Sequence, residues 1–300
     1  MTDRTGRRAG PPQARPARLG GVDGVPAGRG ADRYAVVGNP VEHSRSPAIH
    51  AMFAEQMGQA LSYERLLAPL DGFEATLRAF AGAGALGCNI TVPFKFDAFK
   101  LAAEHTERAA LACAVNTLRF DEGGWVGDNT DGAGLVNDIQ RNARRPLEGL
   151  QVLLVGAGGA AAGVLGSLIA AKPACITVVN RTLDKAQALV DSHAGLGVPL
   201  AAATLADAPA AQDIVVNATS TSLAGAASPV DARVLKPSAL ALDMMYGPKA
   251  QGFLDWAAAH GAEPRDGLGM LVEQAAEAFF FWRGLRPETA SVLAALRAAL

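Results

Sequence analysis

The sequence lacks a large net charge, because 27 basic and 29 acidic residues leave a formal charge of −2 on 300 residues. Without a basic excess it lacks the electrostatic signature of a nucleic-acid-binding protein. It also has only three cysteines, Cys88, Cys113 and Cys175, which form no C-x-x-C motif. They can build neither a disulfide framework nor, by themselves, a metal site. We therefore expect no metal and a cytoplasmic location, where thiols stay reduced.

Long apolar runs are scarce. The one candidate for a membrane span, residues 152–171, carries no charge over twenty residues. Its five glycines and one serine lower the hydrophobicity, and the run divides into a strand, a glycine turn and a helix of small residues. We predict that it forms a βα unit and that the protein does not associate with membranes.

Residues 1–32 have no apolar periodicity and are rich in Arg, Gly, Pro and Ala. They lack the apolar region of a signal peptide. An organelle presequence is the alternative for such an arginine-rich segment, but presequences are amphipathic and poor in acidic residues, whereas this segment holds three aspartates. We predict a disordered tail.

From residue 34 onward, short apolar strands alternate with helical patterns. In the first half we expect strands at 34–38, 62–67 and 88–92, and helices at 47–57, from about 71, and after Pro93, a residue that suits the first helical turn. In the second half, after a helix ending near 141, we expect strands at 151–155, 175–180, 213–218 and 239–245, and helices at 160–171, 184–192, 268–284 and 287–300. This alternation predicts an α/β fold of parallel sheets covered by helices.

A glycine-rich turn separates the strand at 151–155 from the helix that follows. Residues 156–161 fit the pattern G-x-G-x-x-[G/A] in that strand-turn-helix context. Gly156 permits the tight turn, Gly158 lets backbone N–H groups approach a pyrophosphate, and Ala161 allows close helix packing. The helix N-terminus favours an anion. We predict a Rossmann-type dinucleotide-binding domain, the alternative being a tight turn without a ligand.

The end of the next strand, Asn180-Arg181-Thr182, indicates which dinucleotide binds. An NAD site usually has an acidic residue there, to accept a hydrogen bond from the ribose 2′-hydroxyl. Here Arg181 can present its planar guanidinium to a 2′-phosphate, and Lys185 adds a second charge. Cations are otherwise disfavoured at a helix start. The pattern predicts NADP, although a solvated helix face is the alternative.

Short polar clusters lie at the predicted strand ends and helix starts of the first half. Singly, each has a structural explanation: Ser46 as an N-cap before Pro47, Thr91 as a strand residue, Asn116 as a turn residue. In order along the chain, however, the clusters resemble the motifs of the shikimate dehydrogenase family, over residues 34 to about 284. The motifs are G-N-P-x-x-H-S-R-S-P (38–47), N-I-T-V-P-F-K (89–95), A-V-N-T (114–117), G-D-N-T-D-G (127–132), G-A-G-G-A (156–160), N-R-T (180–182), N-A-T-S (217–220), D-M-M-Y (243–246) and D-G-L-G-M-L-V-x-Q-A (266–275).

The resemblance implies reversible NADP-dependent reduction of 3-dehydroshikimate to shikimate, a step of chorismate and aromatic amino-acid biosynthesis. By motif position, Lys95 and Asp131 match the catalytic pair. The substrate-binding positions are Ser44 and Ser46 for the carboxylate, Asn89, Thr91, Asn116 and Gln274 for the ring hydroxyls, and Tyr246 in the same pocket. The cofactor-binding positions are Glu107, Gly156, Ala157, Gly158, Gly159, Ala160, Asn180, Arg181, Thr182, Lys185, Met244 and Gly267.

The chemistry of these residue types fits that reaction. A ring that carries hydroxyls needs short, fixed polar side chains, which reject analogues lacking those hydroxyls. A carbonyl reduced by hydride develops alkoxide character, so a neighbouring ammonium can stabilise the charge and supply the proton. Lysine can do both, whereas arginine does not release its proton near neutral pH. Which member of the Lys95–Asp131 pair carries the proton stays open at this stage.

Two positions depart from the family pattern: Ser222, where many relatives have glycine, and Lys185, where arginine is common. Two other functions stay open as alternatives. One is a quinate/shikimate dehydrogenase with broader substrates and greater use of NAD, and the other is a non-catalytic NADPH-binding regulatory protein. A monomer and a homodimer are equally compatible with the sequence.

We predict two domains with the active site in the cleft between them. Residues 33–131 together with 270–300 would form the substrate-binding domain, and residues 132–269 the NADP-binding domain.

Overall fold

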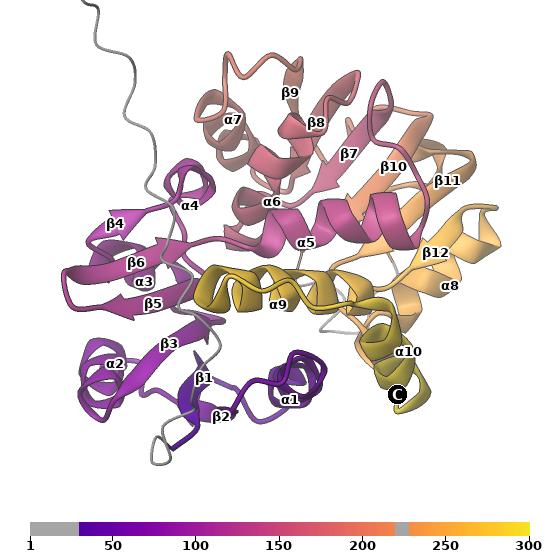
Figure 1. Cartoon of the computed structure of the whole chain (residues 1–300). Helices are drawn as coiled ribbons and strands as arrows, with labels where there is room; N and C mark the ends of the chain where they lie inside the picture. Colours follow the sequence, from indigo (N-terminus) through magenta and orange to yellow (C-terminus); the bar gives the residue numbers. More distant parts are fainter. Residues whose placement is uncertain (1–29, 220–227) are drawn as a thin grey trace, which may run out of the picture. The chain divides into compact units, whose positions relative to one another are not determined.

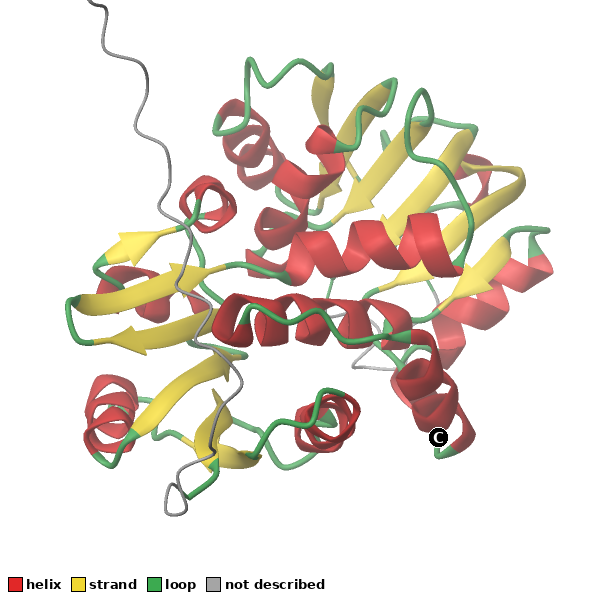
Figure 2. Ribbon diagram, in the orientation of Figure 1, coloured by secondary structure: helices red, strands yellow, loops and turns green. Residues whose placement is uncertain are grey.

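The computed structural model describes residues 30–219 and 228–300, so most of the predicted tail and Ser222 lie outside the described residues. Residues 31–300 fold into two six-stranded sheets and the helices that pack against them (Figures 1 and 2). In the described part of the chain, no helix is both long and apolar enough to cross a membrane. The first strand begins at Asp32, the last residue of the predicted tail.

The first sheet has the strand order β2-β1-β3-β5-β6-β4. Its strands are β1 (Asp32–Gly38), β2 (Leu61–Leu67), β3 (Ala85–Ile90), β4 (Glu104–His105), β5 (Thr117–Asp121) and β6 (Gly124–Asp128). Strand β1 pairs in parallel with β2 and β3, but β5 is antiparallel to both β3 and β6. The prediction of an all-parallel sheet is therefore wrong for this half. Residues 122–123 connect β5 to β6 in a tight hairpin, which brings the two strands together without a crossover helix.

Four helices accompany this sheet: α1 (Ser46–Gln56), α2 (Phe73–Gly82), α3 (Lys95–Leu101) and α4 (Glu107–Ala112). Pro93 does not occupy the first turn of α3, so that prediction is wrong. It follows a cis peptide bond in a turn that the Phe94 N–H closes onto the Thr91 carbonyl, and α3 begins only at Lys95. Ser46 is the first residue of α1 rather than its N-cap, and the N-cap Arg45 makes no side-chain capping bond.

The second sheet is entirely parallel and has the order β12-β11-β10-β7-β8-β9. Its strands are β7 (Gln151–Val155), β8 (Cys175–Asn180), β9 (Leu200–Thr204), β10 (Gln212–Asn217), β11 (Leu235–Asp243) and β12 (Glu263–Arg265), and its helices are α6 (Gly159–Ala170), α7 (Leu183–Asp191) and α8 (Gln251–Ala259). This is the strand order of a doubly wound dinucleotide-binding sheet. The Rossmann-type prediction is confirmed, although the sequence patterns did not predict β9, β12 and α8.

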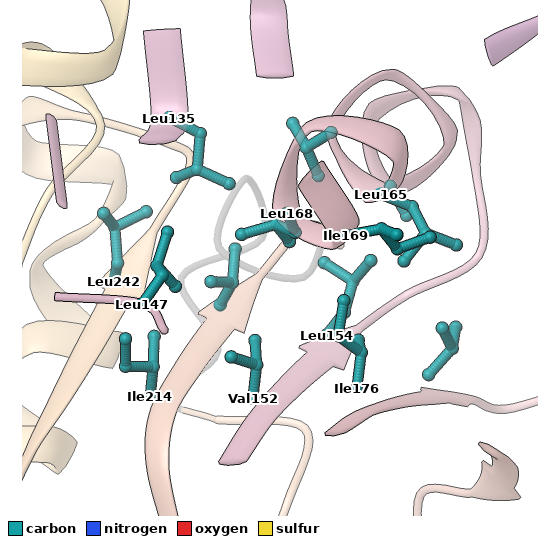
Figure 3. Packing of buried hydrophobic residues seen from close by; sticks show 14 of the residues in the cluster. Leu135, Leu147, Val152, Leu154, Leu165, Leu168, Ile169, Ile176, Ile214 and Leu242 are labelled. Atoms are coloured by element: carbon teal, nitrogen blue, oxygen red, sulfur yellow. The ribbon is translucent and has the colours of Figure 1, made fainter. Parts of the chain in front are cut away.

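Aliphatic side chains fill the space between this sheet and its helices (Figure 3). Val152 and Leu154 of β7 lie under Leu165 and Leu168 of α6, and all four are fully buried. Burying each such side chain contributes about 1.5–3 kcal/mol. This packing fixes the position of α6 on the sheet, and with it the glycine turn from which α6 begins.

Helix α5 (Asp131–Asn137), which a π-helical segment (Asp138–Asn142) extends, packs against both α6 and α9 (Leu268–Arg283) (Figure 1). Glycines allow the close approach. A Cβ added at Gly132 would lie 2.3 Å from Ser167 Oγ of α6, and one added at Gly134 would lie 2.6 Å from Gln274 Cβ of α9. The last helix, α10 (Ala290–Ala298), contributes Val292 and Leu296 to an apolar cluster that it shares with α1 and α9.

The Gly134 contact provides a stability test. Alanine normally stabilises a helix interior relative to glycine by about 1 kcal/mol. At Gly134 the new methyl group would also meet the Gln274 backbone nitrogen and the Met270 carbonyl, each at 2.8 Å. We expect Gly134→Ala to lower the free energy of unfolding by about 1–3 kcal/mol in urea titrations. Gly82→Ala, at a helical glycine with no atom within 4 Å of the new methyl, is the control and should be neutral or stabilising. Equal effects of the two substitutions would contradict the packing argument.

Candidate active site

Lys95 and Asp131 form an ion pair, with 2.5 Å between Lys95 Nζ and Asp131 Oδ2. Lys95 is the first residue of α3 and Asp131 the first of α5, so two helix starts bring the pair together. The Asp131 side chain is 8% exposed and that of Lys95 is 21% exposed. A partly open ammonium held by a buried carboxylate can reach a substrate while keeping its orientation.

Asn116 and Gln274 lie directly behind this pair. Asn116 Nδ2 donates to the second oxygen of Asp131 at 2.8 Å, and it also contacts Gln274 Oε1 at 3.4 Å. Thr130 lies between the two amides, with its hydroxyl 3.2 Å from Gln274 Oε1. All four residues are buried. Two predicted substrate-binding residues are thus in hydrogen-bond contact with the predicted catalytic carboxylate or with each other.

Asn89 extends the cluster along the end of β3. Its Nδ2 donates to Thr117 Oγ1 at 2.9 Å, while its Oδ1 accepts from the Tyr63 hydroxyl at 2.7 Å. Burial raises the pKa of Tyr63 well above its ordinary value, an effect that a hydrogen bond with Ser46 partly offsets. The phenol therefore stays protonated and can donate.

Ser44 and Ser46 stand at the entry to α1, with their hydroxyl oxygens 3.2 Å apart. The Arg65 guanidinium of β2 holds this loop by donating to the Ser44 carbonyl at 2.6 and 3.0 Å. Tyr246 interacts electrostatically with Arg45, the residue between the two serines in the sequence. Burial raises the pKa of Tyr246, and the Arg45 charge opposes that effect.

Thr91 occupies the position expected of it at the end of β3, but it makes no side-chain hydrogen bond with another described residue. Its Cγ2 would lie 2.3 Å from a Cβ added at Gly38, so glycine is required there to admit the threonine. The Thr91 N–H donates to the Val37 carbonyl at 2.9 Å. The hydroxyl is available for a ligand.

The Lys95–Asp131 pair lies beside the first turns of α6. A Cβ added at Gly163 would be 3.2 Å from Asp131 Oδ2, and one added at Gly159 would be 3.3 Å from the Phe96 ring. Phe96 follows Lys95 in α3 and is 47% exposed. The ion pair is therefore adjacent to the glycine-rich turn.

The geometry of that turn suits a pyrophosphate. Gly156 has φ +109°, and an added Cβ would lie 3.1 Å from Thr219 Cγ2, so only glycine fits. Among residues 30–219 and 228–300, no atom lies within 4 Å of the Cβ position of Gly158, the N-cap of α6, whereas Ala161 is fully buried against the sheet. Ala157, Gly159 and Ala160 complete the turn and the first helical residues. The N-terminus of α6 can therefore accommodate an anion.

The end of β8 leaves its cations unpaired. Arg181 and Lys185 are exposed, and neither forms an ion pair with a residue in 30–219 or 228–300. Asn180 Nδ2 donates to the Thr182 carbonyl at 2.9 Å, which shapes the turn into α7. Two free cations at this strand end fit a 2′-phosphate group.

Met244 and Gly267 contact each other, since a Cβ on Gly267 would lie 2.3 Å from the Met244 carbonyl oxygen. Glu107, by contrast, is exposed at the start of α4 and makes no hydrogen bond or ion pair with another described residue. The structure does not join it to the other predicted cofactor residues. Tyr63, Thr117 and Thr130 belong to the cluster but were missed, because tyrosine and threonine are ordinary residues in strands and near helix starts.

Three parts of the chain match models of known protein families. Residues 36–118 match the shikimate dehydrogenase substrate binding domain, residues 138–231 match shikimate / quinate 5-dehydrogenase, and residues 267–297 match the shikimate 5′-dehydrogenase C-terminal domain. A shikimate dehydrogenase (NADP(+)) of Methylibium petroleiphilum is 64% identical over 279 residues, which cover 90% of this chain and 95% of that protein. The chain belongs to the shikimate dehydrogenase family.

Solved structures agree with this membership in the shikimate dehydrogenase family. An Ael1 enzyme from Pseudomonas putida superposes with a TM-score of 0.83 at 44% identity, covering 89% of this chain and 98% of that one. Shikimate 5-dehydrogenase from Thermus thermophilus, in complex with NADP(H) and shikimate, gives 0.80 at 35% identity, covering 90% and 100%. The resemblance carried by the sequence motifs is therefore confirmed.

An ion pair next to Gly267 yields a pH prediction. Both oxygens of Asp266 accept from Arg297 at 2.6 Å, and the Asp266 side chain is 4% exposed. Burial alone would raise the pKa of Asp266, but the hydrogen bonds and charge of Arg297 outweigh it and lower the pKa. This stabilisation is complete above the unfolded pKa of about 3.9 and is lost as pH falls through the folded value.

We expect Arg297→Gln to move the acid-unfolding midpoint, followed by circular dichroism, to higher pH, because burial then dominates the pKa of Asp266. Arg78→Gln, which breaks an exposed pair with Glu74, is the control and should leave the midpoint unchanged. An Arg297→Gln midpoint equal to that of the unsubstituted protein would refute the assignment.

Proposed function

We propose that this chain catalyses the reversible NADP-dependent reduction of 3-dehydroshikimate to shikimate, and so serves chorismate and aromatic amino-acid biosynthesis. The observation that carries the proposal is the Lys95–Asp131 ion pair, 2.5 Å long, at the junction of the amide and hydroxyl cluster with the glycine turn. The relatives named shikimate dehydrogenase (NADP(+)) support it.

The substrate would lie against the polar cluster of the first sheet. Ser44 and Ser46 would bind its carboxylate, while Asn89, Thr91, Asn116 and Gln274 would bind its ring hydroxyls and Tyr246 would line the same pocket. Such fixed donors and acceptors discriminate strongly against analogues without matching groups, because buried polar atoms would then be left unpaired.

Lys95 would supply the proton. Both Asp131 oxygens already accept hydrogen bonds, from Lys95 and from Asn116, which hold the carboxylate in place. The Lys95 ammonium has further N–H groups that can stabilise the oxygen of the carbonyl as hydride reaches its carbon, and then protonate it. In the oxidation of shikimate the same amine would take the proton back.

Bound NADP would supply or accept the hydride. Its pyrophosphate would lie over Gly156, Ala157, Gly158, Gly159 and Ala160, and its 2′-phosphate against Asn180, Arg181, Thr182 and Lys185. Met244, Gly267 and Glu107 are the remaining proposed contacts. Two observations on the described residues support these contacts: none of them has an atom within 4 Å of the Gly158 Cβ position, and none forms an ion pair with Arg181 or Lys185.

We further propose that residues 33–131 and 270–300 act as the substrate-binding domain and residues 132–269 as the NADP-binding domain, with the active site in the cleft between them. The two separate sheets, formed by residues 32–128 and 151–265, support this division. A cytoplasmic enzyme, monomeric or homodimeric, fits the three free cysteines, of which Cys113 is exposed.

Initial rates of shikimate oxidation test the proposal. We expect NADP to be preferred over NAD, and shikimate over quinate. Lys95→Ala should lower kcat at least about 100-fold, because it removes the proton donor, while the Kd for shikimate changes little. Lys100→Ala, which alters an exposed lysine on the same helix, should retain full activity.

Unchanged turnover in Lys95→Ala would refute the catalytic role. Dominant activity with quinate and NAD would instead establish the broader quinate/shikimate enzyme. NADPH binding without turnover of either substrate would indicate a non-catalytic protein.

A further inference from the structure

A hydrogen-bonded chain runs behind the site from Tyr63 to Asp131. We propose that Tyr63 and Thr117 are positioning residues, whose hydroxyls orient the Asn89 and Asn116 amides in a single direction and so fix the Asp131 carboxylate. This inference rests on the proposed function and extends it to two residues to which the family resemblance assigns no role.

One backbone group sets the direction of the chain. The Thr130 N–H, which can only donate, lies 2.8 Å from Asn116 Oδ1. Asn116 must therefore present its carbonyl oxygen on that side and its amino group to Asp131 Oδ1, at 2.8 Å. The orientation of the Asn116 amide follows from the fold of the segment that begins α5.

The same reasoning fixes the direction of the hydrogen bonds that lie further from Asp131. Thr117 Oγ1 lies 2.9 Å from Asn116 Oδ1, an acceptor, so the Thr117 hydroxyl must donate there. It then accepts from Asn89 Nδ2 at 2.9 Å, which turns Asn89 Oδ1 toward Tyr63. The Tyr63 hydroxyl donates to that oxygen at 2.7 Å. Every donor in the chain points toward Asp131.

A second branch ends on Gln274. The other Asn116 N–H donates to Thr130 Oγ1 at 3.0 Å, and the Thr130 hydroxyl lies 3.2 Å from both Gln274 Oε1 and Asn116 Oδ1, so it can donate to either. Gln274 Nε2 donates to the Leu271 carbonyl at 2.9 Å, which fixes this amide independently in the same sense. Three predicted substrate-binding amides thus have defined orientations.

An aromatic stack holds the outer end of the chain. The His50 and Tyr63 rings stack with centroids 4.2 Å apart and an interplanar angle of 6°. His50 is fully buried, which lowers its pKa to about 3, so the ring is neutral and packs as a flat plate. Tyr63 is therefore held in the orientation in which its hydroxyl meets Asn89.

The chain has two consequences for the site. Successive donation polarises each group, which strengthens the bond that Asp131 receives. At the other end, the Tyr63 oxygen can accept from the hydroxyl of Ser46, a proposed substrate-binding residue. A hydroxyl that donates there would strengthen the whole chain, so substrate binding and the orientation of Asp131 are coupled.

Thr117→Val tests the middle of the chain, because it removes the hydroxyl with little change of shape. We expect kcat/KM for shikimate to fall at least about tenfold, with KM for NADP within about twofold of the unsubstituted enzyme. Thr117→Ser, which keeps the hydroxyl, should stay within about threefold. A folded Thr117→Val enzyme with unchanged kcat/KM would overturn the proposal, as would an equal loss in Thr117→Ser.

Tyr63→Phe tests the Tyr63 end of the hydrogen-bonded chain. It also provides a second test if Thr117→Val does not fold. We expect KM for shikimate to rise about fivefold with kcat within about twofold, since the amide loses its anchor. Tyr34→Phe is the matched control, because Tyr34 pairs with Tyr63 in the β1–β2 ladder but does not contact Asn89. Equal kinetics of the two variants would overturn the proposal.

Failure of the proposed function is recognised separately. If the unsubstituted protein does not turn over shikimate, hydrogen exchange of the Asn116 side-chain amide, measured by NMR, decides whether the chain exists. Protection in the unsubstituted protein and in Thr117→Ser, together with its loss in Thr117→Val, would support it. Equal exchange in all three would refute it.

Discussion

The site depends on how closely helix α5 packs between α6 and α9. Asp131 is the first residue of α5, and its carboxylate lies against Gly163 of α6. Gly132 and Gly134 let α5 approach its two neighbours to distances at which a methyl group would collide with Ser167 and Gln274. Any change in this packing moves the carboxylate relative to Lys95, to the Asn116 amide and to the glycine turn at once.

Arginine and lysine have different roles in this structure. Arginines make the buried structural pairs: Arg108 with Asp128, Arg265 with Asp138, and Arg297 with Asp266. Their planar guanidinium groups bind carboxylates in two places and stay charged, which suits a permanent contact. Only six of the basic residues are lysines, and Lys95 is the one at the proposed reaction centre. There a cation that can release its proton is needed.

Much of the fold and of the candidate site could be predicted from the sequence. The β7–α6–β8 unit was predicted to within a residue or two because its apolar runs and glycine turn are local signals. The β5–β6 hairpin and the turn at Pro93 were not predicted. Their turn residues lie within or beside motif residues, which are also compatible with other local backbone structures. Membership of the cluster was predicted only for residues to which the family resemblance assigns a role. Tyr63 and Thr117 join it through pairing across strands, which no single segment reveals, and the direction of the chain follows from one backbone N–H of Thr130.

The central claim is that the Lys95–Asp131 pair meets the reacting oxygen of the substrate. A crystal structure of the protein with shikimate and NADP tests it most directly. The account predicts Lys95 Nζ within hydrogen-bond distance, about 3 Å, of the shikimate hydroxyl that faces the nicotinamide, with Asp131 still bound to Lys95 and Asn116. Shikimate bound with that hydroxyl away from Lys95, or a nicotinamide on another face of the protein, would contradict it.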